Sequence, residues 1–136
     1  MAEGTPTAPG KQTILLVDDE QFFRTVLSEA LEENGYIVTT ASSGEEAVRQ
    51  ASAIHPDVII LDVVMPGMDG FATCQALATN ALTRHIPVIM LTGSADPQLT
   101  QKAFSAGAAF TLPKSSEVET LLRTLALALA QRRPSP

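Results

Sequence analysis

The chain has 136 residues, of which 45% are hydrophobic and 18% are charged, and its formal net charge is −6. This length predicts one domain with ample apolar material for a core. The acidic balance argues against direct nucleic-acid binding, which favours a basic face. No apolar run reaches the length of a transmembrane helix, and the first residues lack the pattern of a signal peptide, so we expect a cytoplasmic protein.

Residues 1–10, rich in Pro, Gly, Thr and Ala, are expected to form a flexible tail. Residues 134–136 are expected to be a second tail or the start of a linker, which leaves a domain over 11–133. Short apolar runs bounded by turn signals predict buried strands. Such runs, together with a β-rich segment after the first helix, lie at 13–17, 36–40, 57–62, 87–91 and 109–112.

A helix is predicted after each strand. The first follows an apolar period of 3.6 from Phe22 to Leu31 and ends near Gly35, a typical residue after a helix. A third helix is expected from about Gly70 to Thr79. Helix-opening signals precede the other three, at 43–46, at 96–97 and at 116–119. This alternation predicts an α/β fold, a doubly wound parallel sheet with helices on both faces.

Polar residues stand where the strands end. Asp18 and Asp19 follow the first strand, Asp62 ends the third, Thr92 follows the fourth, and Lys114 closely follows the fifth. Open parallel sheets place their ligands at this edge, so we expect these side chains to meet there. Three crowded carboxylates repel one another and favour a bound dication, for which Mg²⁺ is the natural choice.

This constellation resembles the receiver domain of two-component response regulators, of the single-domain, chemotaxis-regulator-like kind, from about Lys11 to Arg133. The resemblance implies a flavodoxin-like five-stranded sheet in the order 2-1-3-4-5. It implies that Asp62 accepts a phosphoryl group in a magnesium-dependent reaction, assisted by Thr92 and Lys114. By the same resemblance, the metal ligands are Asp18, Asp19, Asp62 and the backbone carbonyl of Val64.

The function implied by the resemblance is a phosphorylation-controlled switch. The phosphodonor is a phosphohistidine on a sensor histidine kinase or a histidine phosphotransfer protein. By the same resemblance, we expect the chain not to be an enzyme in the usual sense but to promote only its own phosphorylation and dephosphorylation. A downstream protein partner is expected to bind the surface around the fourth and fifth helices, and no nucleic acid or membrane is expected to bind directly.

Two positions depart from the family pattern. The residue three before Lys114, usually aromatic in receivers, is Thr111, and the adjacent Phe110 faces the other way on a strand. The proline that usually follows the lysine is Ser115, which removes the preference for a cis bond. We therefore expect an intact phosphoacceptor apparatus and an altered means of transmitting its state.

Other classes of protein remain alternatives. The chain could be a receiver fragment of a larger regulator or hybrid kinase. A haloacid-dehalogenase-type phosphatase also forms an aspartyl phosphate, but Asp18-Asp19 lacks the Asp-x-Asp spacing of that family. A flavodoxin-type flavin carrier needs a Ser/Thr-rich phosphate loop after the first strand, where this chain is acidic.

The last helix carries a prediction about the partner surface. At 100° per residue from Val118, Leu122, Leu125 and Leu129 form a stripe that should face the core. Leu127 falls about 180° away, on the expected solvent face. A single exposed leucine is ordinary, but we hypothesise that Leu127 joins a self-association or partner contact that phosphorylation modulates. We expect the single cysteine, Cys74, to be an inert buried side chain.

Overall fold

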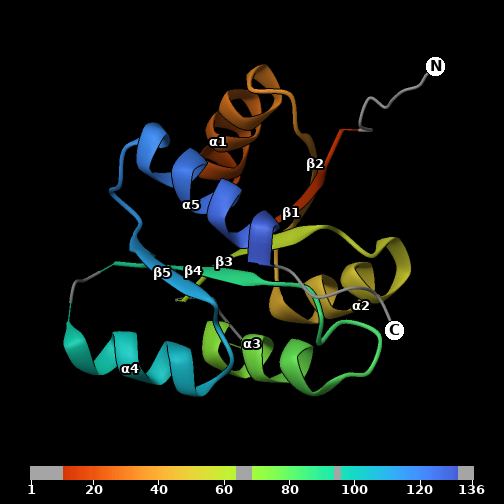
Figure 1. The fold of residues 1–136 in the computed structure, drawn as a ribbon, viewed down its shortest axis with the longest axis vertical. Coiled ribbons are helices and arrows are strands. Elements are labelled where there is room, and N and C mark those ends of the chain that lie inside the picture. Colours follow the sequence, from red (N-terminus) through yellow and green to blue (C-terminus); the bar gives the residue numbers. More distant parts are fainter. Residues whose placement is uncertain (1–10, 64–68, 94–95, 132–136) are drawn as a thin grey trace.

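The computed structural model describes residues 11–63, 69–93 and 96–131. Within them strands and helices alternate strictly, as predicted (Figure 1). The predicted tails and Val64 lie outside the described residues. The strands are β1 Thr13–Val17, β2 Ile37–Ala41, β3 Val58–Asp62, β4 Val88–Thr92 and β5 Phe110–Pro113. The helices are α1 Gln21–Glu33, α2 Gly44–Ile54, α3 Gly70–Thr79, α4 Pro97–Ser105 and α5 Val118–Gln131.

All five strands pair in parallel, in the order β2-β1-β3-β4-β5 that the family resemblance implied. Val17 lies beside Leu61, and Asp62 lies beside Leu91. The carboxyl ends of the central strands therefore meet at one edge of the sheet, and α/β sheets bind ligands at that edge.

The two faces of the sheet carry separate apolar clusters, because successive side chains of a strand point to opposite faces. From β1, Leu15 and Val17 join the cluster formed with α2, α3 and α4. Ile14 and Leu16 join the cluster formed with α1 and α5. In Figure 1, α1 and α5 accordingly lie on one side of the sheet and α3 and α4 on the other. This two-sided cover fixes the strand register and so fixes which residues reach the carboxyl edge.

Local sequence signals explain several helix ends. The hydroxyl of Ser43 accepts a 3.2 Å hydrogen bond from the Glu46 amide, and Asp96 caps α4 through a 2.9 Å bond from the Gln98 amide. Gly35 follows α1 with a φ of +93°, a conformation that suits glycine. The predicted opening of α5 is shifted. The first helical residue is Val118, and the Glu117 carbonyl accepts the first helical bond, 3.2 Å from the Leu121 amide.

The predicted core stripe of α5 is partly wrong. Leu125 is fully buried, but Val118 is 39% exposed, and the buried stripe is turned toward Leu121 and Ala128. Apolar residues surround much of this helix, so periodicity alone leaves the centre of the buried face undetermined, and packing on β3, β4 and β5 sets it. The predicted exposure of Leu127 is confirmed, at 53%.

Two further predictions concern single positions. Cys74 on α3 is a free thiol that is fully buried, and burial raises the pKa of that thiol to about 11. Within the described ranges every peptide bond is trans, including the bond between Lys114 and Ser115. In the same part of the chain, no helix has the length and apolar character needed to cross a membrane.

Candidate functional site

Asp18 is a buried carboxylate at the end of β1. Its side chain has no exposed surface, and its Oδ1 accepts a 2.8 Å hydrogen bond from the backbone amide of Glu20. One turn into α1, the guanidinium of Arg24 donates a 2.6 Å bond to the Asp18 carbonyl. These bonds fix the turn that joins β1 to α1. Asp19, the next residue, is exposed at the rim.

Asp62 is the last residue of β3 and is only 5% exposed. The start of α3 lies directly against the backbone that carries it. A methyl group built on Gly70 would overlap the Asp62 carbonyl oxygen and stand 2.6 Å from the Val63 Cα. The Gly70 amide also donates a 2.9 Å bond to the Val63 carbonyl. Glycine at position 70 therefore allows the close approach that sets the position of the Asp62 end of β3.

Lys114, just after β5, joins the acidic residues. Its Nζ lies 2.8 Å from Asp18 Oδ2, 2.9 Å from Glu20 Oε1 and 3.5 Å from Asp62 Oδ2. Burial disfavours the charged ammonium, but the hydrogen bonds to Asp18 and Glu20 and the nearby charge of Asp62 outweigh it. The pKa of Lys114 is therefore raised above its ordinary value. The same ammonium stands 4.5 Å from the centre of the Phe23 ring, a cation–π distance.

Thr92 ends β4 and is buried, with 3% of its surface exposed. Its carbonyl accepts a 2.7 Å hydrogen bond from the Lys114 amide. The predicted residues Asp18, Asp19, Asp62, Thr92 and Lys114 thus occupy one edge of the sheet, where four of the five strands end.

The carboxylates suit a hard cation. One oxygen from each of Asp18, Asp19 and Asp62 can be chosen so that all three lie within 4.8 Å of one another. Oxygen ligands of this kind are the donors that Mg²⁺ prefers. The fit therefore supports the ion that the sequence predicted, while the fourth expected ligand, Val64, falls outside the described residues.

Sequence reasoning missed two members of this site. Glu20, which follows the Asp18-Asp19 pair, and Phe23, which lies in the apolar pattern of α1, are not among the site residues predicted from the sequence. Both contact Lys114, which lies more than ninety positions away in the sequence. One signal could have pointed to Glu20. It stands where a helix N-cap is expected, and a shorter side chain is usual there.

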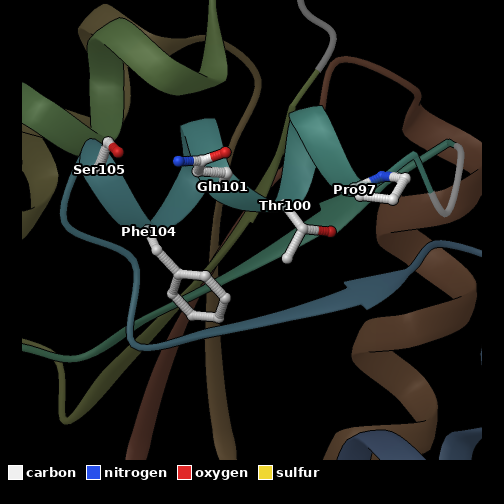
Figure 2. Close-up of a pocket in the computed structure, with 5 residues that line it drawn as sticks. All are labelled: Pro97, Thr100, Gln101, Phe104 and Ser105. Carbon is white, nitrogen blue, oxygen red and sulfur yellow. The ribbon is translucent and has the colours of Figure 1, made fainter.

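The α4 side of the molecule has a different character. A shallow depression lies on α4, and Figure 2 shows that Thr100 and Phe104 line it. Phe104 is 48% exposed. Thr111, at the position where receivers usually carry an aromatic residue, is half-buried in β5 beside Met90 of β4.

The strand order and the helices on both faces define a doubly wound α/β domain with an acidic, lysine-bearing edge. A model of the response regulator receiver domain matches residues 14–126. The chain therefore belongs to the response regulator receiver domain family of two-component signalling proteins. Family membership favours the signalling class over the dehalogenase-type and flavin-carrier alternatives.

Several relatives agree with this assignment. The chain is 47% identical over 79 residues to the alkaline phosphatase synthesis transcriptional regulatory protein PhoP of Bacillus subtilis, covering 58% of this chain and 32% of that protein. Chemotaxis protein CheY4 of Vibrio cholerae is similar in structure, with a TM-score of 0.82, 37% identity, and coverage of 87% of this chain and 98% of that chain.

The receiver domain of a sensor histidine kinase from Pseudomonas aeruginosa is also similar. It matches with a TM-score of 0.83 and 30% identity, covering 89% of this chain and 99% of that chain, and it has a magnesium ion coordinated in its active-site cleft. The chain spans about a third of the length of the first curated relatives that it matches. Activities and partners of those whole proteins therefore come to this chain only as proposals.

Proposed function

We propose that this receiver domain is a switch that accepts a phosphoryl group on Asp62. The observation that carries the proposal is the Asp62 carboxylate itself. It is almost fully buried at a strand end, 3.5 Å from the Lys114 ammonium and clustered with Asp18 and Asp19. A nucleophilic carboxylate between positive charge and potential metal ligands is what aspartyl-phosphate chemistry requires.

The phosphodonor in this proposal is a phosphohistidine of a sensor histidine kinase or a histidine phosphotransfer protein. An oxygen of Asp62 forms a bond to phosphorus as the phosphorus–nitrogen bond breaks, and the ring, already protonated on its other nitrogen, leaves as neutral imidazole with the bonding electron pair. Lys114 is placed to neutralise charge on the transferred group, and Thr92 to donate a hydroxyl hydrogen bond to it. Transfer of this kind depends mainly on positioning and charge neutralisation.

Magnesium is the proposed cofactor. Asp18, Asp19, Asp62 and the Val64 carbonyl would hold it, and the bound cation would supply positive charge beside the phosphoryl oxygens. The three clustered carboxylates and the magnesium in the related Pseudomonas receiver support this assignment.

We further propose that phosphorylation changes the surface around α4 and α5 and so alters binding of a downstream protein partner. The bond between the Lys114 amide and the Thr92 carbonyl joins the ends of β4 and β5 beside the site. Phe104 on α4 and Leu127 on α5 offer exposed apolar contacts. Cys74 is a free, buried thiol, which fits the reducing cytoplasm as the proposed location.

Intact-mass measurement tests the acceptor assignment. Incubation with a small acyl phosphate and magnesium should add one phosphoryl mass to the wild-type chain and none to Asp62→Asn. Chelation of the metal should slow the reaction strongly. Labelling that persists in Asp62→Asn, or that proceeds unchanged with chelator, contradicts the proposal.

A further inference from the structure

Glu20 occupies the N-cap position of α1, but its side chain makes no hydrogen bond to the amides of that helix. Asp, Asn, Ser and Thr are the residues that usually cap a helix from this position, because their short side chains reach the nearby amides. The longer glutamate instead extends to Lys114, with Oε1 2.9 Å from Nζ. The side chain of Glu20 is 65% exposed.

The backbone of Glu20 is held while its carboxylate faces solvent. Its amide donates to the buried Asp18 side chain, and its carbonyl accepts a 3.1 Å bond from the Arg24 amide. Within the described residues, three carboxylates contact Lys114; those of Asp18 and Asp62 are buried, and that of Glu20 is exposed. Glu20 can therefore release Lys114 by a side-chain rotation into water, with no change of the sheet.

Glu20 also changes the charge balance of the site. Asp18, Asp19 and Asp62 contribute three negative charges, which a bound dication and Lys114 would cancel. Glu20 adds a fourth negative charge, which lies next to the Lys114 ammonium. The site would thus carry one excess negative charge when a phosphodonor arrives, and that charge would compete with the phosphoryl group for the same ammonium.

We propose that Glu20 is a specificity-determining residue that disfavours phosphodonors in proportion to their negative charge. This inference rests on the proposed function of Asp62. In the resting state Glu20 holds Lys114, and the arriving phosphoryl group takes its place. A small dianionic donor is fully repelled by the excess negative charge, whereas a donor whose leaving group carries a proton and a positive charge is repelled less. Donors with a protonated nitrogen leaving group are therefore preferred over acyl phosphates.

Two small donors separate these cases. With acetyl phosphate, a dianion, an Asp62 oxygen bonds to phosphorus as the phosphorus–oxygen bond breaks, and acetate leaves with the electron pair. With phosphoramidate, whose zwitterion has a net charge of minus one, the phosphorus–nitrogen bond breaks. The nitrogen then leaves as neutral ammonia, already carrying its protons. Neither step needs a further reactant.

The experiment measures phosphorylation rates of the wild-type chain, Glu20→Gln and Glu29→Gln with both donors in magnesium. Glu29 is an exposed residue farther along α1, so its variant removes the same charge away from Lys114. In Glu20→Gln, the acetyl phosphate rate should rise about fivefold more than the phosphoramidate rate, since removing a nearby charge helps the dianion more. Glu29→Gln should leave the ratio of the two rates unchanged.

Salt supplies a second readout. Raising ionic strength should shrink the difference between wild type and Glu20→Gln, because the exposed charge is screened. A merely structural role for Glu20 would change both rates together and would not respond to salt in this way. An unchanged donor ratio in Glu20→Gln, with Asp62 still labelled, overturns this inference and leaves the proposed function standing. Failure of every donor to label wild-type Asp62 overturns both.

Discussion

The carboxyl edge of the sheet and the surface formed by α4, the edge strand β5 and α5 are built in different ways. At the edge, Lys114 contacts three carboxylates among the described residues, two from the turn between β1 and α1 and one from the end of β3, and two of the three are buried. On the surface of α4, β5 and α5, Phe104 and Leu127 are about half exposed, and β5 carries Thr111 where receivers usually have an aromatic residue. The proposed phosphoryl transfer would constrain the carboxyl edge tightly, whereas the surface of α4, β5 and α5 could vary with the proposed partner.

Gly70→Ala should have the largest effect of the substitutions at the carboxyl edge. Helix propensity alone predicts stabilisation by up to about 1 kcal/mol. The added methyl would instead overlap the Asp62 backbone, so we expect the free energy of unfolding to fall by about 3 kcal/mol. Urea denaturation measures the change.

Gly93→Ala is the matched control for that experiment, because a methyl there meets nothing within 4 Å in the part of the chain that the structure describes. It should change the free energy of unfolding by less than about 0.5 kcal/mol. Equal effects of the two substitutions would show that the close contact at Gly70 does not set the strand end.

Magnesium should stabilise the protein by binding at the carboxyl edge alone. Binding to the native state at a hundredfold excess over the dissociation constant adds about 2.7 kcal/mol to the free energy of unfolding. Asp19→Ala should lose most of that gain while staying stable without the metal, because one source of carboxylate repulsion is removed. Thermal melts with and without magnesium measure this.

Glu33→Ala removes an exposed acid at the far end of α1 and serves as the control. It should keep the full rise in melting temperature. A rise in Asp19→Ala as large as in the wild-type chain would place the metal elsewhere.

Much of the carboxyl edge could be predicted because strand ends are local signals. The apolar run at 13–17 predicts β1 with the bounds that the structure shows, and an acid at the end of a buried run can be assigned to the edge without any knowledge of packing. The contact between Glu20 and Lys114 could not be predicted, because 94 positions separate them and only the folded sheet brings them together. The buried face of α5 failed for a related reason, since leucines occur at several angles around that helix.

Leu127→Glu tests the surface of α4, β5 and α5. We expect phosphorylation of Asp62 to be unchanged, because Leu127 is exposed on α5 and makes no part of the acidic edge. Self-association or partner binding should weaken, by roughly tenfold if the leucine is buried in the contact. Light scattering with and without a phosphate mimic measures the association.

Val118→Glu is the matched control on the same helix. Val118 is partly exposed and lines a small groove with Phe23 of α1, away from the proposed contact. It should leave association intact. Wild-type association in Leu127→Glu would refute the role of Leu127 and would leave the acceptor chemistry untouched.

Locating the phosphoryl group itself tests most directly whether Asp62 is the phosphoacceptor. The phosphorylated chain is reduced with borohydride, which converts an aspartyl phosphate to homoserine, and the digested peptides are sequenced by mass spectrometry. We expect homoserine at position 62 alone and none in a sample that received no phosphodonor. Homoserine at position 18 or 19, or a stable phosphate on a hydroxyl side chain such as that of Thr92, would contradict it.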